Sequence, residues 1–250
     1  MMKQDLVSII VPFYENKNLL NKAIQSILKQ SYKKYEIIII NEKIDEQNIE
    51  FLKKLKKKNR KIKIIFNKKN LGAGRSRNEG IKISKGKYIA FLDSDDRWKK
   101  NKLHEQLKFM KKNKFMASHT SYEIVDLENN YLSIRNAKNL TYENLLNSCD
   151  IGLSTVIINS KLVKNLINPF PNLVTKEDFV LWLKISKKKI IFFGLNKNLS
   201  YWTDTPNSLS KSILQKIKDA IKVYFIYENM NLIKSIYFTF KLSINYILKK

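Results

Sequence analysis

The first hundred residues alternate between short apolar runs and longer segments with helical periodicity, and this alternation constrains the fold more than any other feature. The apolar runs lie at residues 6–12, 35–40, 62–66 and 88–92. Runs of this length without polar alternation are typical of parallel strands that are covered on both faces. The pattern therefore predicts an α/β fold on a doubly wound sheet.

The segments between these strands carry apolar residues at three- and four-residue spacing, which places them on one face of a helix. This spacing predicts helices over residues 19–30, around residues 49–55, and over residues 72–83, the last opening with a glycine-rich turn. In doubly wound sheets, ligands bind beyond the carboxyl ends of the strands. Residues 41–42 and 93–96 are therefore expected at the binding edge.

The second half of the chain is less regular. We expect a helix from about Leu103 to Lys112, strands within residues 115–125 and 131–135, and helices at residues 142–147 and 177–187. The pattern of residues 210–250 predicts two helices that are separated near residues 229–231. Both helices are rich in lysine and aromatic residues.

Composition excludes several classes of protein. A chain with 44% hydrophobic residues is not disordered throughout. The single cysteine, Cys149, excludes a disulfide framework, and two histidines, His104 and His119, are too few for a histidine-rich metal centre. We expect Cys149 and His119 to be packing residues. Neither a secretory signal nor an apolar run of the ~20 residues needed to cross a bilayer is found, so we expect a reduced, cytoplasmic protein.

The formal net charge is +26, from 48 lysines and arginines against 22 aspartates and glutamates. Such an excess indicates a nucleic-acid or anionic-membrane partner. Lysine, asparagine and isoleucine, which have AT-rich codons, are abundant, so genome bias explains much of the lysine content. The net charge alone does not distinguish between a solvated basic surface and a functional surface that binds an anionic partner.

Three carboxylates, Asp93, Asp95 and Asp96, follow the fourth predicted strand within four residues. Crowded like charges are unfavourable unless a cation or hydrogen-bond donor compensates them. A Mg²⁺ or Mn²⁺ ion bound by one or two carboxylates and a substrate phosphate would do so. The alternative is a solvated turn, or an N-cap for a helix that begins near Trp98.

The segment from Gly72 to Gly80 is not a phosphate-binding P-loop, because it lacks the Gly-Lys-Ser/Thr sequence. It is also not a dinucleotide fingerprint, because Arg77 occupies the third glycine position. A helix N-terminus with glycines and two guanidiniums is suited to binding a diphosphate or to fixing nearby carboxylates. A simple helix start with surface arginines is the alternative.

Glu177 and Asp178 begin the predicted helix at residues 177–187. Carboxylates are favoured at a helix start by the dipole, so capping alone would explain them. The functional alternative is a general base that takes a proton from an acceptor hydroxyl, with Trp182 lining a pocket beside it.

Four segments of the chain, VSIIVPFYEN (7–16), NLGAGRSRNEGIKISKGKYIAFLDSDD (70–96), KEDFVLWL (176–183) and NSLS (207–210), occur in order. Together they resemble the family 2 glycosyltransferases, in particular the small bacterial members that assemble surface polysaccharides. The resemblance covers residues 6 to 210. It implies a GT-A fold with a Rossmann-like nucleotide-binding half, a mixed central sheet and C-terminal helices.

The resemblance also implies how the chain is divided. Residues 1–210 would form the GT-A domain, with the donor half at about 1–98 and the acceptor half at about 99–210. Residues 211–250 would be a helical extension packed on this domain or on the membrane.

By the same resemblance, Asp178 would be the catalytic base, supported by Glu177. Trp182 and Trp202 would lie on the acceptor side. Asp95 would coordinate a Mn²⁺ or Mg²⁺ ion that bridges the donor diphosphate. Donor contacts are expected from Pro12, Tyr14, Glu42, Arg77, Asp93, Asp95 and Asp96.

Two positions depart from the family pattern. Glu42 stands where the aspartate that meets the base or ribose is usual, and Trp202-Thr203 replaces Tyr-Arg, so that Lys211 is a candidate for the missing cation. Donor identity is therefore not fixed by the motif.

The resemblance implies a metal-dependent, inverting glycosyltransferase that transfers a sugar from a nucleotide-sugar, most simply a UDP-sugar, to a glycan or lipid-linked acceptor. The basic, aromatic C-terminal helices predict peripheral binding to the anionic inner face of the membrane. The alternatives are a basic protein that binds nucleic acid or another anionic surface, and an inactive glycosyltransferase-like scaffold. The transferase interpretation includes no nucleic-acid partner.

Overall fold

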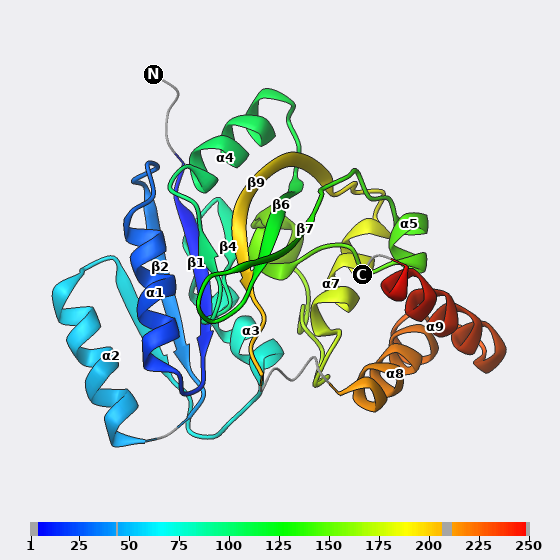
Figure 1. Cartoon of the computed structure of the whole chain (residues 1–250), viewed down its shortest axis with the longest axis horizontal. Coiled ribbons are helices and arrows are strands. Elements are labelled where there is room, and N and C mark those ends of the chain that lie inside the picture. The colour runs from blue at the N-terminus through cyan, green and yellow to red at the C-terminus, as the bar shows by residue number, and fades with distance from the viewer. Residues whose placement is uncertain (1–4, 44, 207–211, 249–250) are drawn as a thin grey trace.

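The four apolar runs of the first half form neighbouring parallel strands in the order β3-β2-β1-β4 (Figure 1). A computed structural model describes residues 5–43, 45–206 and 212–248. The strands are β1 (Val7–Phe13), β2 (Tyr35–Asn41), β3 (Ile62–Phe66) and β4 (Tyr88–Phe91). Each lies within a residue or two of its predicted range, which confirms the strand predictions for this half.

Helices cover both faces of this parallel sheet. They are α1 (Lys17–Leu28), α2 (Glu46–Lys58) and α3 (Ala73–Ile83). Alternate residues of β1 point to opposite faces: Ile9 packs in one apolar cluster with Ile24 of α1, and Ile10 packs in the other with Ile81 of α3. The near-continuous apolar character of β1 and β2 thus reflects burial on both sides.

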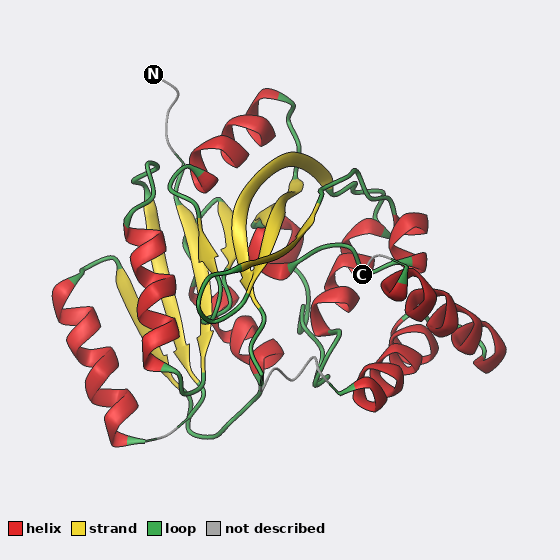
Figure 2. Cartoon of the chain, in the orientation of Figure 1, coloured by secondary structure: helices red, strands yellow, loops and turns green. Residues whose placement is uncertain are grey.

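The sheet continues beyond β4 with mixed strand directions, and the strand β9 curls across it (Figure 2). β8 (Ile157–Asn159) is antiparallel to β4, β6 (Ala117–Val125) is antiparallel to β8, and β9 (Phe193–Thr203) is parallel to β6. β5 (Arg97–Trp98) pairs with β9, and β7 (Tyr131–Arg135) pairs with β6. The expected mixed α/β architecture is confirmed.

The sequence did not reveal β5, β8 or β9. β5 and β8 are too short, at two and three residues, to show a periodicity. β9 is interrupted by polar residues such as Asn196 and Asn198, and its pairing with β6 shifts register near Ser121, so alternation is lost. The helix expected to begin near Trp98 was wrong: Trp98 belongs to β5, and α4 (Lys102–Lys112) starts after Asn101.

The remaining helices are α5 (Tyr142–Asn147), α6 (Lys161–Lys164) and α7 (Glu177–Ser186), with a 3₁₀ turn, η1, at Leu153–Thr155. The C-terminal part contains α8 (Ile213–Lys222), a π-helical turn, η3, at Val223–Tyr227, and α9 (Leu232–Ile247). α8 and α9 lie together at one end of the molecule (Figure 1). Ala220 of α8, Val223 and Tyr224 of η3, and Leu242 of α9 share an apolar cluster with α7. Across the described ranges, no helix is long and apolar enough to traverse a bilayer.

Candidate active site

The Asp93–Asp96 turn at the carboxyl end of β4 is held by hydrogen bonds from the second half of the chain. The Asp93 N–H donates to Ser154 Oγ at 3.1 Å, and the Ser154 hydroxyl donates to Asp96 Oδ2. The Thr203 N–H donates to Asp96 Oδ1 at 3.0 Å, and the Thr203 hydroxyl donates to the Asp95 carbonyl at 2.6 Å. The strand β9 and the turn η1 therefore fix the shape of this acidic turn.

Asp96 is only 1% exposed, and both of its carboxylate oxygens accept hydrogen bonds from the protein. A direct contact of the Asp96 carboxylate with the donor, expected from the resemblance, does not fit this burial. Because its oxygens are already used, Asp96 orders the turn that presents Asp93 and Asp95.

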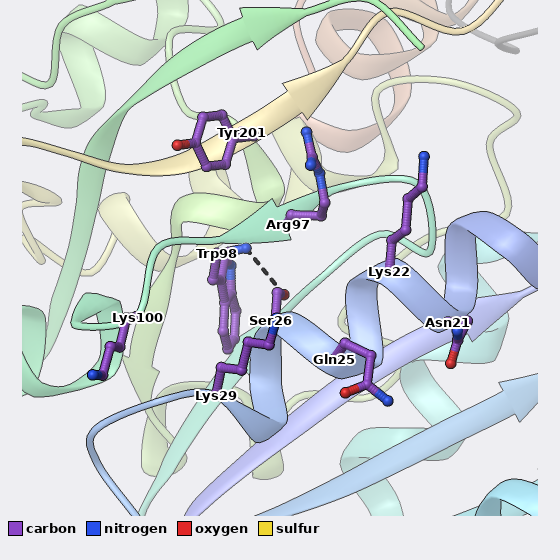
Figure 3. A pocket seen from close by; sticks show the side chains of 9 residues that line it. All are labelled: Asn21, Lys22, Gln25, Ser26, Lys29, Arg97, Trp98, Lys100 and Tyr201. Carbon is purple, nitrogen blue, oxygen red and sulfur yellow. Dashed lines mark hydrogen bonds between the residues drawn. The ribbon is translucent and has the colours of Figure 1, made fainter. Parts of the chain in front are cut away.

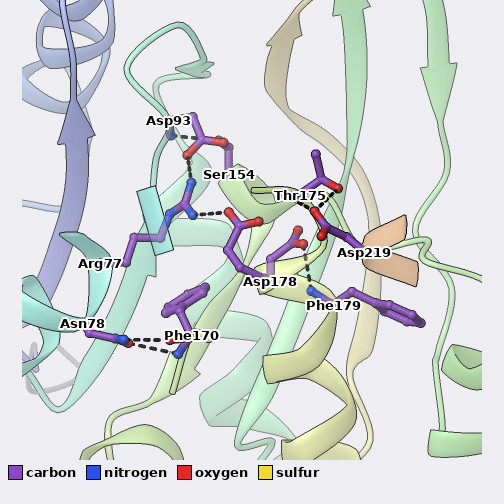
Figure 4. Close-up of polar contacts among 10 residues, drawn as sticks. Arg77, Asn78, Asp93, Ser154, Phe170, Thr175, Asp178, Phe179 and Asp219 are labelled. Carbon is purple, nitrogen blue, oxygen red and sulfur yellow. Dashed lines mark hydrogen bonds and ion pairs between the residues drawn. The ribbon is translucent and has the colours of Figure 1, made fainter. Parts of the chain in front are cut away.

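Arg77 joins this turn to the start of α7 (Figure 4). Its Nη2 lies 2.7 Å from Asp93 Oδ1, and its Nη1 lies 2.6 Å from Glu177 Oε1. The side chain is 4% exposed and its guanidinium lies 5.5 Å from the centre of the Phe170 ring. The sequence alternative of a surface arginine is wrong for Arg77, while the neighbouring Arg75 is exposed.

Two glycines allow α3 to bring Arg77 to this position. Gly72, which precedes the helix, has φ 76°, a conformation that side chains disfavour. A Cβ atom on Gly74 would lie 3.0 Å from both Glu177 Cγ and Pro171 O. The absence of a side chain at Gly74 therefore lets α3 approach the start of α7 closely.

Asp178 lies in the first turn of α7, next to Glu177. It is partly exposed, and its Oδ1 accepts a hydrogen bond from the Phe179 N–H at 2.7 Å. The preceding residue, Lys176, adopts a left-handed conformation with φ 67°. This residue turns the chain sharply into the helix. The first turn then presents Glu177 to Arg77, while Asp178 lies beside it with its carboxylate on the Phe179 N–H (Figure 4).

Burial raises the pKa values of several carboxyl groups in this cluster. The pKa of Asp95 is about 6, because burial and the charge of Asp93 disfavour ionisation. The pKa of Glu177 is about 7, through burial and the charge of Asp178, although Arg77 opposes this shift. Burial also raises the pKa of Asp178, against the attraction of Arg77 and Lys176, and the pKa of Asp96. One guanidinium is therefore insufficient to compensate the acidic groups around it.

This excess of negative charge fits a divalent cation beside Asp95. In the described part of the chain, no group of three or more His, Cys, Asp and Glu side chains is arranged to hold a metal. Mg²⁺ and Mn²⁺ need only one or two carboxylates when substrate phosphates complete the coordination. The partly exposed Asp95 carboxylate, whose pKa is raised, has the chemistry and the exposure that such a ligand needs.

Glu42, at the carboxyl end of β2, is also close to this cluster. It is 6% exposed, and burial raises its pKa, while the charge of Arg77 and a hydrogen bond from Ser76 oppose the shift. Its position next to Arg77 agrees with the predicted binding edge. Its burial means that it faces the protein more than an open pocket.

Pro12 and Tyr14 lie at the end of β1. Pro12 is buried in the strand, whereas Tyr14 is 45% exposed, with Lys43 Nζ 5.6 Å from the centre of its ring. Beside them is an open groove of about 740 Å³ between the segments that follow β1 and β2. Its lining residues are Glu15, Asn16, Lys17, Asn18, Lys43, Asp45, Gln47 and Asn48.

Trp182 does not line an open pocket. It is fully buried, and its ring packs against Phe91 and Phe192 at centroid distances of 6.3 and 5.1 Å. Trp182 is therefore a core residue of the sheet–α7 interface, and its prediction as an acceptor-side residue was wrong. Trp202 lies on β9, partly buried. The NSLS motif at 207–210 and Lys211 lie outside the described residues.

A second open groove, of about 550 Å³, lies between α1, β5 and β9 (Figure 3). Among its lining residues are the basic side chains Lys22, Lys29, Arg97 and Lys100, and the ring of Tyr201. The Trp98 N–H donates to Ser26 Oγ at its base (Figure 3). This groove includes none of the predicted site residues.

Several residues that organise the site were missed in the sequence. Ser154 carries no local signal, because the turn it holds lies 58 residues away along the chain. Thr203 was noted only as part of the Trp202-Thr203 departure from the family pattern, and its contact with the acidic turn, 107 residues away, was not predicted. Thr175 also escaped notice: its N–H and hydroxyl both donate to Asp219 on α8. Their side chains act through tertiary contacts, which a linear motif does not display.

The chain is similar to known bacterial glycosyltransferases over most of its length. A putative teichuronic acid biosynthesis glycosyltransferase, TuaG from Bacillus subtilis, is 32% identical over 90% of this chain and 88% of its own length. WfaP of Escherichia coli, named a UDP-Glc:alpha-D-GlcNAc-diphosphoundecaprenol beta-1,3-glucosyltransferase, is 34% identical over 93% of this chain and 87% of its own.

Solved structures share the fold. TarS of S. aureus in complex with UDP-GlcNAc superposes with a TM-score of 0.72 at 20% identity, over 92% of this chain and 69% of the TarS chain. The mannosyltransferase PcManGT from Pyrobaculum calidifontis, in complex with GDP-Man and Mn²⁺, gives a TM-score of 0.69 at 12% identity, over 95% and 70% of the two chains. These likenesses confirm the expected GT-A fold.

The family model for Glycosyl transferase family 2 matches residues 8–164, a span that includes β1, the Arg77 helix and the Asp93–Asp96 turn. Together with the curated relatives, this match establishes a nucleotide-sugar-dependent glycosyltransferase, with relatives in cell-surface polysaccharide synthesis. The match therefore favours the transferase over the alternative, drawn from the net charge, of a basic protein whose function is to bind nucleic acid or another anionic surface. The chain belongs to glycosyl transferase family 2.

Proposed function

We propose that this protein is a metal-dependent, inverting glycosyltransferase that moves one sugar from a UDP-sugar to a hydroxyl of a lipid-linked glycan. The observation that carries this proposal is the double ion pair of Arg77 with Asp93 and Glu177. It gathers the carboxylate turn of the donor half and the Glu177–Asp178 pair into one cluster, as a single-displacement site requires.

In the proposed reaction, Asp178 accepts the proton of the acceptor hydroxyl. The acceptor oxygen forms a bond to the anomeric carbon while the bond from that carbon to the diphosphate oxygen breaks, and the electron pair leaves with the nucleoside diphosphate. Attack from the face opposite the diphosphate inverts the anomeric configuration. The raised pKa of Asp178, caused by burial, makes it a stronger base than a solvated aspartate.

Glu177 and Arg77 hold this base in place. Arg77 Nη1 orients Glu177, whose neighbour Asp178 is then presented at the start of α7. A divalent ion bound by Asp95 would stabilise the charge that develops on the leaving diphosphate. Asp93, already paired with Arg77, sets the geometry of the turn on which Asp95 lies.

Two relatives support the donor and acceptor classes. TarS is solved with UDP-GlcNAc, and WfaP is named for UDP-Glc and a diphosphoundecaprenol-linked acceptor. We infer a UDP-sugar and a lipid-diphosphate-linked glycan for this chain by analogy. The identity of the sugar is set by the contacts of the donor pocket.

The proposal is tested by thermal shift with UDP, GDP and their sugar conjugates, with and without Mn²⁺, because ligand binding to the native state raises its melting temperature. We expect a rise of about 5–10 °C with a UDP ligand only when Mn²⁺ is present. Asp95→Ala is expected to lose this metal-dependent shift, whereas Asp178→Asn keeps it and loses turnover. The reverse pattern contradicts the role assignment, and binding without turnover in the wild type indicates an inactive scaffold.

The C-terminal helices support a site at the membrane surface. α9 buries the polar residues Ser235 and Thr239 and exposes apolar ones, so its amphipathic pattern is opposite to that of a helix that faces water. Its exposed apolar residues are Leu232, Ile233, Ile236, Tyr237, Phe240, Ile244 and Ile247. Such a face is typical of a helix that lies in a membrane interface.

Charge agrees with an anionic bilayer as the partner. Within residues 212–248, the acidic residues Asp219 and Glu228 are buried, and the charged residues that are exposed are all lysines: Lys218, Lys234 and Lys241. We propose that the enzyme binds peripherally to the cytoplasmic leaflet through this face. Flotation with vesicles containing anionic phosphatidylglycerol should recover the wild type but not Ile236→Glu/Phe240→Glu. Wild-type protein that stays unbound at low salt contradicts the proposal, and a dimer in light scattering points to self-association instead.

A further inference from the structure

Asp219 is a fully buried acidic residue of α8 that contacts the segment leading into α7, the helix that carries Glu177 and Asp178 (Figure 4). Its Oδ2 accepts the Thr175 N–H at 2.9 Å and the Thr175 hydroxyl at 3.1 Å. The amide of Gln215, one turn earlier on α8, donates to the same oxygen at 2.9 Å. Thr175 thus receives a two-point attachment from the C-terminal part of the chain.

The contact between Asp219 and Thr175 precedes the proposed catalytic residues in the chain by two to three positions. Thr175 is followed by Lys176, whose φ of 67° makes the sharp turn, and then by Glu177 and Asp178. In the part of the chain that the structure describes, the hydrogen bond found for the Asp178 carboxylate is the one from the Phe179 N–H. The position of Asp178 is therefore set by its backbone, which is held at Thr175 by Asp219 and at Glu177 by Arg77.

We propose that Asp219 is a positioning residue for the transfer reaction: by holding Thr175, it sets where the first turn of α7 places Asp178. The inference rests on the proposed role of Asp178 as base. The inference assigns α8 a role in positioning the active site. From the sequence, this helix was predicted to belong to an extension outside the transferase domain. Misplacement of a reacting group by about 1 Å can cost about 100-fold in rate, so a small shift of Thr175 would be measurable.

A second buried acid provides a matched control. Glu228, 8% exposed, follows the π-helical turn and contacts the Tyr142 hydroxyl and Lys187 Nζ. Tyr142 is on α5, and Lys187 follows the far end of α7, so Glu228 attaches the C-terminal helices without touching the segment that precedes Asp178. Loss of Glu228 should loosen the same helices while leaving the first turn of α7 in place.

The test compares Asp219→Ala, Asp219→Asn and Glu228→Ala in the full chain, measuring UDP release from UDP-GlcNAc and UDP-Glc. Asparagine can accept all three hydrogen bonds through its amide oxygen, so Asp219→Asn should keep near-wild-type kcat. Asp219→Ala should lose about 10- to 100-fold in kcat with donor KM changed by less than about twofold. Glu228→Ala should lower the melting temperature with kcat largely retained.

Hydrogen exchange of the peptide around Thr175 provides a readout that needs no substrate. Exchange at residues 174–179 should accelerate in Asp219→Ala and stay near the wild-type rate in Asp219→Asn and Glu228→Ala. Equal kcat losses in Asp219→Ala and Glu228→Ala, or unchanged exchange at Thr175, would overturn the inference. An Asp178→Asn enzyme that keeps full turnover would instead show that the proposed base is wrong.

Discussion

The guanidinium of Arg77 lies 2.6 Å from Glu177 Oε1, although the two residues are 100 positions apart in the chain. The same guanidinium contacts Asp93 at 2.7 Å, so one buried side chain connects α3, the end of β4 and the start of α7. Because both halves of the candidate site meet at this contact, its geometry controls the distance between the Asp93–Asp96 turn and the start of α7, where the proposed base, Asp178, lies.

Arg77→Lys should reduce kcat by about 100-fold or more, because a single ammonium does not reproduce the forked contact with two carboxylates. The melting temperature should also fall, since the shorter reach of one ammonium leaves Asp93 or the largely covered Glu177 carboxylate, 12% exposed, without its partner. Steady-state kinetics and thermal unfolding check this, with the exposed Arg75→Lys as the matched control. Equal activities of the two variants would contradict the bridging role.

Gly74→Ala should lower kcat by about 10-fold, since the new Cβ would lie 3.0 Å from Glu177 Cγ and from the Pro171 carbonyl. The backbone carbonyl has little freedom to move, so Glu177 must shift. A crystal structure of the variant should show a displaced Glu177 carboxylate. Full activity with Glu177 in place would show that the approach of α3 to α7 is less restrictive than the geometry indicates.

Ser154→Ala should impair metal-dependent donor binding more than global stability. The substitution removes the acceptor of the Asp93 N–H and a donor to Asp96, and thereby releases the acidic turn. Titration with Mn²⁺ and UDP should show an affinity loss of about 10-fold. Ser186→Ala is the control, because Ser186 is also buried but its hydroxyl has no hydrogen-bond partner in the described chain. Equal effects of the two changes would argue against a specific role.

The pH dependence of stability should reveal the raised pKa of Asp95, about 6 against a usual value of 3.8. Between these values the native state binds more protons than the unfolded state, so ionisation of Asp95 removes stability as the pH rises from about 4 to 6. Asp95→Asn should therefore gain in melting temperature relative to the wild type, by about 2–6 °C at pH 8 and little at pH 4. Mn²⁺ affinity of the wild type should weaken below pH 6, because protonation competes with the ion. A constant difference between the two proteins across this range would exclude an ionisation at this site.

The sequence was most informative where structure is locally encoded. The buried strands β1, β2 and β4 follow from short apolar runs, and the helices between them follow from apolar residues at three- and four-residue spacing. Burial on one or two faces leaves such a linear pattern. The acidic turn was located because it follows a buried strand directly. Arg77 and Asp178 were predicted as site residues because each lies in a continuous segment that resembles the family, residues 70–96 and 176–183.

The tertiary structure decided which of these groups face one another and which are used inside the protein. Asp96 and Trp182 have residue types suited to a sugar-binding site, yet one is fixed by Ser154 and Thr203 and the other lies in the core. The attachment of Thr175 by Asp219 spans 44 residues and has no periodicity. Hydrogen bonds between distant segments depend on how the strands are ordered in the sheet and how α8 packs. A linear pattern records which face of an element is buried, but it does not record the partner that meets that face.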